Sequence, residues 1–377
     1  MIRVAYLCLD PGVPVFGSKG ASVHVQEIIR SWRARGAEVT IYCTRPGADV
    51  PVDLADVPVV VQRIPKGSGV ERERAQAAAA ATLADRVIAD GATVVYERYS
   101  LFSDALARVT SALNIPGFLE VNAPLIDEQR IHRSLVGEDV ALEALRRQVA
   151  AAARTVCVSE PVAEWVRERV SSGHHSKVAV VPNGVNVNRI QPTPEAVGSP
   201  VVVFVGTLKP WHGVETLIQA KAVASTDWSL RIVGDGPEGQ RLRELAVASG
   251  TSVEFTGAVT PELIPAALAG CAVATAPYPA MADANDQYFS PLKIYEYCAA
   301  GLPVVASRVG QVPSIIDDGV TGLLVDPSSP AALAAAIDDL AGAPLARAAM
   351  SDAARTMATD HHSWDSVLDR ITEGIMA

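Results

Sequence analysis

An alternation of apolar strands and amphipathic helices, separated by glycine-containing turns, constrains the fold of this chain more than any other feature. Residues 4–9 form an apolar run, followed by a Gly/Pro loop, a helical pattern over 22–35 and a second apolar run at 39–43. Strand–helix–strand units of this kind build parallel sheets through right-handed crossovers. We therefore expect an α/β fold.

The alternation occurs in two blocks. In the first block, further strands are expected at 57–63, 94–96, 117–121 and 155–159, and helices at 75–89 and 127–153. A polar, proline-containing stretch at 188–200 is typical of a linker. Strands then resume at 201–205, 228–233, 253–256, 272–276, 304–306 and 323–325. This predicts two doubly wound, Rossmann-like domains, residues 1–188 and 189–360, and 377 residues suffice for two cores.

Composition narrows the possible partners and compartment. A net charge of −10 argues against nucleic acid as the main partner. The five cysteines are scattered and form no disulfide framework or metal-binding pattern, so we expect a reducing, cytoplasmic setting. The apolar run at 4–9 is too short to span a bilayer, which leaves at most a peripheral membrane contact.

The loop after the first strand, residues 10–22, is rich in glycine. It matches neither the Walker A sequence nor GxGxxG, because Lys19 precedes Gly20. Ser22 could cap the following helix, whose N-terminus would attract phosphate. An ordinary flexible turn explains the loop equally well.

The second block carries more specific motifs. Its strands are followed by Gly206-Thr207-Leu-Lys209-Pro-Trp-His212-Gly, by Gly234-Asp-Gly-Pro, by Gly257-Ala-Val259, and by Ser290-Pro291-Leu292-Lys293-Ile-Tyr-Glu296. Loops at the carboxyl ends of parallel strands meet at one edge of the sheet, where ligands bind in such folds. We expect these segments to form one site.

This series resembles the donor-binding domain of retaining glycosyltransferases of family 4, which have the GT-B fold. Gly20, His24, the helix end at 35–36, the segment 158–160 and the segment 181–185 extend the resemblance over nearly the whole chain. The resemblance implies two domains that face each other across a cleft. The first would bind the acceptor and the second a nucleotide-diphosphate sugar, with a final helix (residues 361–377) crossing back to the first.

The resemblance also implies roles for individual residues. Glu296 matches a glutamate that accepts hydrogen bonds from the ribose hydroxyls, although a surface helix would also place a glutamate there. The family's preceding glutamate is replaced by Tyr288, so the sugar would be recognised by Tyr288, by backbone groups, or by Asp283 and Asp286. The family's basic pair falls on Thr207 and His212. Lys209 and Lys293 therefore become the candidates to stabilise the leaving diphosphate, against the alternative of solvated surface lysines.

The remaining expected contacts divide between donor and acceptor. The donor-binding set is Gly20, Gly206, Thr207, Gly234, Gly257, Val259, Tyr288, Ser290, Pro291, Leu292 and Glu296. On the acceptor side, Asn122 occupies the place of a family histidine, and Glu120 could act as a base or hydroxyl anchor or merely tie down a turn. Ser22 and His24 complete this set, although capping or packing explains His24 as well.

These assignments predict a retaining hexosyltransferase that uses a UDP- or GDP-sugar and serves glycan or glycoconjugate biosynthesis. The acceptor would be a glycan, a lipid-linked molecule or a small molecule. No HExxH, DxD, GxSxG or cysteine cluster is found in the sequence, and the resemblance implies that neither metal nor cofactor is needed. Two alternatives stay open: a nucleotide-sugar 2-epimerase, and a non-catalytic nucleotide-sugar-binding partner subunit. The base, the sugar and the acceptor are not determined by the sequence.

Overall fold

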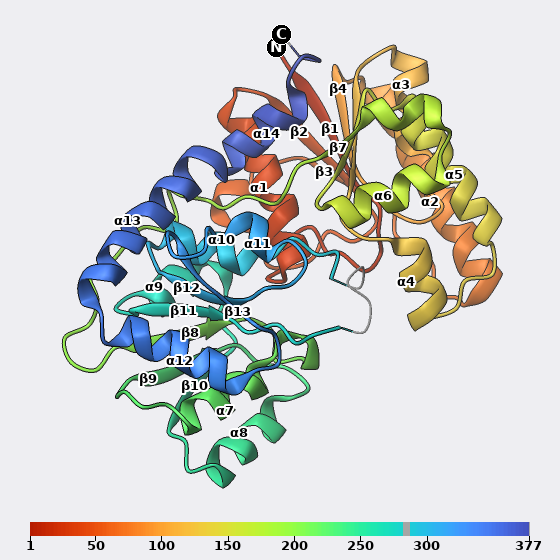
Figure 1. Ribbon diagram of the computed structural model, residues 1–377. Helices are drawn as coiled ribbons and strands as arrows, with labels where there is room; N and C mark the ends of the chain where they lie inside the picture. Colours follow the sequence, from red (N-terminus) through yellow and green to blue (C-terminus); the bar gives the residue numbers. More distant parts are fainter. Residues whose placement is uncertain (282–286, 377) are drawn as a thin grey trace. The chain divides into compact units, whose positions relative to one another are not determined.

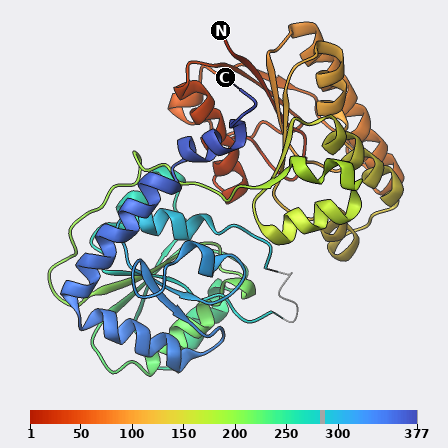
Figure 2. The same cartoon turned by 45° about the horizontal axis from the view of Figure 1, so that its top comes forward.

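The computed structural model describes residues 1–281 and 287–376. The chain divides into two α/β units, shown in two views in Figures 1 and 2. Unit 1 contains Met1–Pro182, Tyr288–Ser290 and Val367–Ala377, and unit 2 contains Asn183–Gln287 and Pro291–Ser366. Two α/β units with parallel sheets confirm the expected fold class.

Unit 1 is built on one parallel sheet with strand order β3-β2-β1-β4-β5-β6-β7. The strands are β1 (Arg3–Cys8), β2 (Glu38–Cys43), β3 (Val59–Val61), β4 (Val94–Arg98), β5 (Gly117–Val121), β6 (Arg154–Cys157) and β7 (Val178–Val180). The helices are α1 (Gly20–Ala34), α2 (Gly69–Asp90), α3 (Ala105–Leu113), α4 (Leu125–His132), α5 (Glu138–Ala151) and α6 (Glu160–Arg169), with short 3-10 turns at Val52–Leu54 and Ser172–Lys177. The last helix, α14 (Trp364–Thr372), begins in unit 2 and belongs to unit 1 from Val367 onward. The central strands are buried because helices cover both faces of the sheet.

Unit 2 repeats this architecture with strand order β10-β9-β8-β11-β12-β13. The strands are β8 (Val201–Val205), β9 (Ser229–Val233), β10 (Val253–Gly257), β11 (Val273–Ala276), β12 (Val304–Ser307) and β13 (Gly322–Val325). The helices are α7 (Val214–Ala222), α8 (Gly239–Ala248), α9 (Ile264–Leu268), α10 (Leu292–Ala299), α11 (Val312–Ile315), α12 (Pro330–Ala341) and α13 (Pro344–His361), with 3-10 turns η3 (Pro210–His212) and η4 (Pro261–Leu263).

The helix expected over 127–153 is instead two helices, α4 and α5. The chain turns between them, and the backbone amides of Val136 and Gly137 donate to the buried carboxylate of Glu73 at 2.7 and 2.8 Å. Glu73 lies more than sixty residues earlier on α2. The break therefore depends on a distant carboxylate that the local helical pattern does not reveal.

The expected linker, residues 188–200, is packed as part of unit 2. Arg347 on α13 pairs with Glu195 at 2.6 Å. Arg355, about two turns further along α13, donates to the carbonyl oxygens of Val187 and Ile190 at 3.0 and 2.8 Å. Two arginines of α13 thus hold this stretch to unit 2, which begins at Asn183.

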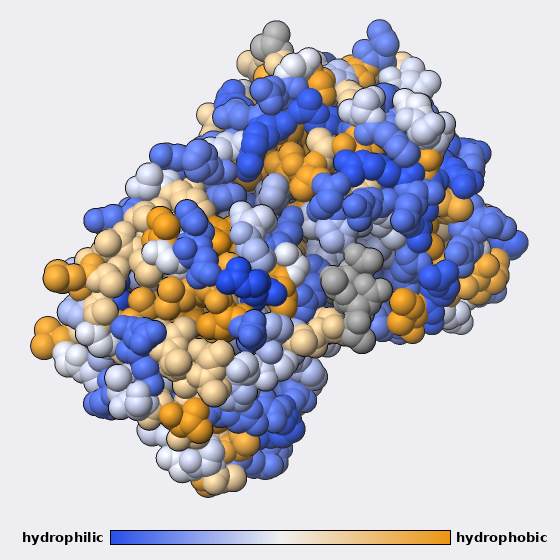
Figure 3. Space-filling view, in the orientation of Figure 1, coloured by the Kyte–Doolittle hydropathy of each residue, from blue (hydrophilic) through white to orange (hydrophobic). Residues whose placement is uncertain are grey.

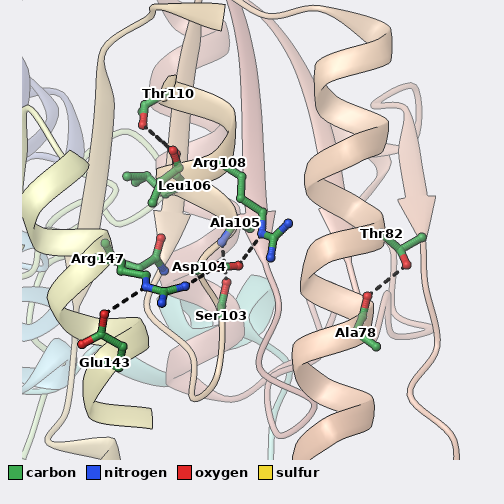
Figure 4. Close-up of polar contacts among 12 residues, drawn as sticks. Ala78, Thr82, Ser103, Asp104, Ala105, Leu106, Arg108, Thr110, Glu143 and Arg147 are labelled. Atoms are coloured by element: carbon green, nitrogen blue, oxygen red, sulfur yellow. Dashed lines mark hydrogen bonds and ion pairs between the residues drawn. The ribbon is translucent and has the colours of Figure 1, made fainter. Parts of the chain in front are cut away.

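Charged side chains on the helices of unit 1 form ion pairs along the surface. Asp104, just before α3, accepts from Arg108 at 2.6 Å and lies 3.7 Å from Arg147 of α5, which also pairs with Glu143 (Figure 4). In the face drawn in Figure 3, hydrophilic side chains cover most of this part of unit 1, whereas apolar ones take a larger share of unit 2. Exposed surface pairs of this kind contribute little to stability.

Candidate active site residues

The loops that follow β8, β9 and β10 are joined by close backbone contacts between glycines. The amide of Gly206 donates to the carbonyl of Val233 at 2.9 Å, and the amide of Gly234 donates to the carbonyl of Gly257 at 2.8 Å. A Cβ at Gly234 would lie 1.9 Å from the carbonyl oxygen of Gly206. Gly206 and Gly234 therefore shape this strand edge, and their amides are already used within the protein.

Lys293, in the first turn of α10, places its ammonium group beside this edge. Nζ is buried and has no hydrogen-bond partner within 1–281 or 287–376. It lies 4.2 Å from the ring centre of Phe204 and 5.3 Å from that of Tyr278, and a Cβ on Gly206 would approach it to 2.8 Å. Burial lowers the pKa of Lys293 to about 7, although the nearby carboxylate of Glu296 acts in the opposite direction.

His212 lies at the end of η3 and packs against the same two rings. Its ring centre is 6.1 Å from that of Phe204 and 6.2 Å from that of Tyr278. Nδ1 contacts the carbonyl oxygen of Thr207, which can only accept, so Nδ1 carries the hydrogen. Burial and the charge of Lys293 lower the pKa of His212 to about 3. His212 is therefore neutral at physiological pH and supplies no positive charge.

The other donor-side candidates of unit 2 surround this pair. Lys209 is half-buried, and its Nζ lies 4.4 Å from the ring centre of Trp211. Glu296 lies one helical turn after Lys293 on α10, which begins at Leu292 with Pro291 before it. Val259 follows the end of β10. Arg308, another cation of unit 2, is paired with Asp318 at 2.7 Å.

In unit 1, Glu120 is the centre of a buried polar cluster at the carboxyl end of the sheet. One carboxylate oxygen accepts from the hydroxyl of Tyr96, and the other lies 2.6 Å from Nε2 of His24 and 3.3 Å from Arg98. Asn122 donates to this second oxygen. Burial alone would raise the pKa of Glu120, but His24, Arg98 and Tyr96 outweigh it and lower the value to about 2.

The position and partners of Glu120 bear on its two expected roles. The residue lies within β5, not in the loop after it, and only 2% of it is exposed. Its carboxylate binds four side chains and has a low pKa, so it is poorly suited to remove a proton near neutral pH. The same carboxylate orients His24 and Asn122.

Gly20, Ser22 and the glycine-rich loop lie at the start of α1. The helix begins at Gly20, earlier than expected, and Lys19 makes no side-chain cap. Ser22 is not the cap: it lies in the first turn and donates inward to the carbonyl of Pro14 at 2.6 Å. Gln26 donates to the carbonyls of Val15 and Gly17, both at 3.0 Å. The loop is thus fastened from α1, not a freely flexible turn.

Tyr288 and Ser290 belong to unit 1, whereas the expected boundaries placed them in the second domain. The hydroxyl of Tyr288 donates to Glu128 of α4, and its carbonyl oxygen accepts from Ser159 at 2.5 Å. The structure therefore groups Tyr288 with α4 and α6 of unit 1. Asp283 and Asp286, the other candidates for sugar recognition, lie outside the described residues.

Sequence reasoning missed Arg98 and Tyr96, both on β4. Their signal was available in the sequence, because Tyr96-Glu97-Arg98 is an unusual polar run at the end of an expected buried strand. Over the described residues, no three His, Cys, Asp or Glu side chains gather as they do around a metal ion. In the same residues, we find no helix with the length and apolarity needed to cross a membrane.

Two family models match this chain. One, described as Glycosyltransferase Family 4, matches residues 18–189, and the other, described as Glycosyl transferases group 1, matches residues 199–342. The chain belongs to the family 4 glycosyltransferases. The resemblance seen in the sequence is thereby confirmed.

Curated relatives of this glycosyltransferase include two with informative descriptions. A Mycolicibacterium smegmatis protein, described as GDP-mannose-dependent alpha-(1-6)-phosphatidylinositol monomannoside mannosyltransferase, is 32% identical over 56% of this chain and 60% of its own length. A D-inositol 3-phosphate glycosyltransferase of Acidothermus cellulolyticus is 26% identical over 98% of this chain and 89% of that protein. The match to the first thus spans only about 60% of that relative.

Solved structures support the fold. Anabaena HepE in complex with UDP superposes with a TM-score of 0.72 at 20% identity, over 99% of both chains. At this identity the likeness shows the GT-B fold alone.

Proposed function

We propose that this glycosyltransferase moves a hexosyl group from a UDP- or GDP-sugar to an acceptor hydroxyl, with retention of configuration and without a metal ion or other cofactor. The observation that carries this proposal is the buried ammonium of Lys293, which lacks a hydrogen-bond partner in the described part of the chain. A buried cation is costly unless it meets an anion. Its position at the ligand-binding edge of the sheet suits a diphosphate.

The other donor contacts follow from position. Lys209 adds a second cation in the loop after β8, and the N-terminus of α10, residues Leu292–Ala299, offers backbone amides to phosphate oxygens. Glu296 would accept from the ribose hydroxyls. The backbone from Gly257 to Val259 would hold the base. Both mannosyltransferases and UDP-binding proteins occur among the matched proteins, so UDP and GDP are both candidates.

The proposed reaction needs no protein nucleophile. The bond between the anomeric carbon and the donor phosphate oxygen breaks as the acceptor oxygen bonds to the same face of that carbon. The released phosphate oxygen takes the acceptor proton. The protein then has two tasks, to position the reactants and to stabilise the charge that develops on the diphosphate.

The acceptor would bind to unit 1. His24 and Asn122, both oriented by Glu120, are the candidates to hold the acceptor hydroxyl, and the amide of Gly20 would approach the donor phosphate. The descriptions of the relatives name phosphatidylinositol mannoside and inositol phosphate, so a polyol or lipid-linked glycan acceptor is the first to test. Such an enzyme would act in the cytoplasm with at most a peripheral membrane contact.

The decisive experiment incubates the protein with UDP- and GDP-hexoses, with and without inositol-based and glycan acceptors, in the presence of EDTA. Transfer with an unchanged anomeric configuration by NMR supports the proposal. Epimerised donor in the absence of acceptor would identify a 2-epimerase, and binding without turnover would identify a non-catalytic subunit. Either result, or a requirement for metal, would contradict the proposal or that part of it.

Lys293→Ala tests the residue behind the proposal. It should lower kcat by about 10²–10³, the range for removing a transition-state charge stabiliser. Lys221→Ala is the matched control, because Lys221 is a lysine of unit 2 whose Nζ lies over the ring of Trp228 at 4.4 Å. An equal, small effect of both substitutions would refute the role of Lys293.

A further inference from the structure

The space around Lys293 is apolar on most sides. The aromatic rings of Phe204 and Tyr278 lie within 4.2 and 5.3 Å of Nζ, and Gly206 contributes no side chain. An ammonium ion in such surroundings has exchanged its water shell for ring faces, which compensate only part of the cost. The ligand-free protein therefore favours loss of the lysine proton.

The charged and titratable groups that face Lys293 come from each neighbouring element. Glu296, on α10 itself, favours the ammonium form, while burial disfavours it. Tyr278 after β11 and Tyr297 on α10 are neutral, since burial raises the pKa of both hydroxyls. The cation Lys209 and the imidazole of His212 lie in the loop after β8, and burial together with the charges of Lys293 and Lys209 lowers the pKa of His212.

The protonation state of His212 determines whether a second group besides Lys293 can take up a proton at this site. The carbonyl of Thr207 accepts from Nδ1–H and so selects the tautomer, while burial and the charge of Lys293 keep the imidazole neutral against the opposite effect of that hydrogen bond. The neutral ring packs against Phe204 and Tyr278, the two rings that surround Lys293 Nζ, without adding charge. Among the groups around Nζ within 1–281 and 287–376, Lys293 is thus the one whose charge can change near neutral pH.

We propose that this site binds its diphosphate together with a proton, which Lys293 Nζ takes from solvent when the phosphate oxygens enter the space between Nζ and the rings of Phe204 and Tyr278, while the buried imidazole of His212 takes no part in the exchange. This inference rests on the proposed function and adds a property to it. Diphosphate release then returns the proton to solvent. Product affinity accordingly falls as the pH rises.

The test is calorimetric titration of the full-length protein with UDP and with GDP at pH 8, in two buffers of different ionisation enthalpy. Near this pH the diphosphate is fully ionised, so its own protons do not contribute. We expect uptake of close to one proton per bound nucleotide. From pH 8 to 9, well above the pKa of Lys293, the affinity should fall by about tenfold, as required when binding is linked to one proton. Uptake near zero, or a flat profile, would overturn the inference.

Two variants assign the proton. Lys293→Arg keeps a permanent charge, so uptake at pH 8 should disappear and its affinity profile should become flat. His212→Asn keeps an N–H donor near the Nδ1 position but cannot be protonated, and it should bind with the same uptake as the unchanged protein. Loss of uptake in His212→Asn would assign the proton to the imidazole and refute the inference.

Failure of the inference is distinguishable from failure of the proposed function. If neither UDP nor GDP binds at pH 6.5, where Lys293 is charged, the nucleotide site itself is wrong. Binding at pH 6.5 with no proton uptake at pH 8 leaves the nucleotide site intact and refutes only the coupling.

Discussion

Two buried glutamates on neighbouring strands of unit 1 should respond in opposite ways to the same substitution. Glu120 on β5 has a pKa of about 2, because its bonds to His24, Arg98 and Tyr96 outweigh burial. Glu97 on β4 is also buried, but burial dominates there and raises its pKa to about 7 despite hydrogen bonds from Ser103, Gln148 and Leu106. Replacing either by glutamine removes the charge and almost preserves the shape.

The expected cost of Glu120→Gln follows from its surroundings. A pKa of about 2 in place of 4.5 corresponds to roughly 3 kcal/mol of preference for the ionised form. Breaking a buried ion pair costs about 3–5 kcal/mol by independent measure. His24 and Arg98, only 6% and 12% exposed, would lose their anionic partner. For a unit of this size, the melting temperature should fall by about 6–12 °C.

Glu97→Gln should behave differently because folding already favours the protonated carboxyl. An amide resembles that form, and the buried oxygen of Gln148, which lacks a partner in the described part of the chain, could accept from it after an amide flip. We expect a change within about 1 kcal/mol at pH 6 and a gain in stability at pH 8. This variant controls for the loss of a buried carboxylate as such.

The pH dependence gives a second measure with opposite signs. Glu120, with a lowered pKa, contributes stability that is fully present above pH 4.5 and is lost as the pH falls toward 2. Glu97, with a raised pKa, contributes stability below pH 4.5 that is lost as the pH rises through 7.

The assay is thermal unfolding, with hydrogen exchange of β4 and β5 peptides to locate the effect, because a two-unit protein need not unfold in one step. An unchanged melting temperature for Glu120→Gln, together with lost turnover, would refute the structural role and restore Glu120 as a chemical participant.

Three further substitutions test other parts of the structure. Glu296→Ala should weaken nucleotide binding by about 1.5–3 kcal/mol, as for loss of a charged hydrogen bond, with unchanged melting; equal affinity in calorimetry would remove it from the donor site. Gly234→Ala should destabilise unit 2 more than Gly257→Ala, because only the former Cβ would meet backbone, 1.9 Å from the oxygen of Gly206; equal melting temperatures would contradict this. Arg355 donates to carbonyl oxygens of residues 187 and 190, so Arg355→Met should loosen the segment 187–191 and speed protease cleavage there. Arg243→Met is the control, because the Arg243 guanidinium lies over the ring of Phe255. Equal cleavage rates in the two variants would contradict the proposed effect of Arg355.

The sequence predicted most strands well because the central ones are short apolar runs buried on both faces, which requires no knowledge of distant partners. It did not predict the short edge strand β7. The expected strand at 228–233 begins only one residue early. The helix expected over 127–153 was wrong because Glu73 on α2 holds its break. The roles expected for Ser22 and for the linker failed for the same reason: both depend on contacts made by distant side chains.

The candidate site likewise combines features that the local sequence predicted with features that depend on contacts between distant residues. The sequence identified Lys293 from its place in a loop-to-helix motif, and the structure supplies what the motif lacks, namely that Nζ is buried. It could not show that His212 is neutral, because that depends on burial, on Lys293 and on the carbonyl of Thr207. Arg98 and Tyr96 lie beside Glu120 because β4 pairs with β5, and the sequence alone does not show this pairing.

Gly206 contributes to the site in two ways, through its backbone amide and through the absence of a side chain. Its amide is used by the carbonyl of Val233, so it cannot also donate to a ligand without breaking the strand edge. What the position offers instead is the absence of a side chain, since any Cβ there would come within 2.8 Å of Lys293 Nζ. The glycine after β8 thus acts on the proposed diphosphate site by leaving room for the cation. Gly206 also has a φ of +154°, so Gly206→Ala is strained in any background. It should nevertheless cost less stability in a Lys293→Ala background, because the ammonium is then gone and the nearest remaining atom is at the ring edge of Phe204, 3.3 Å away.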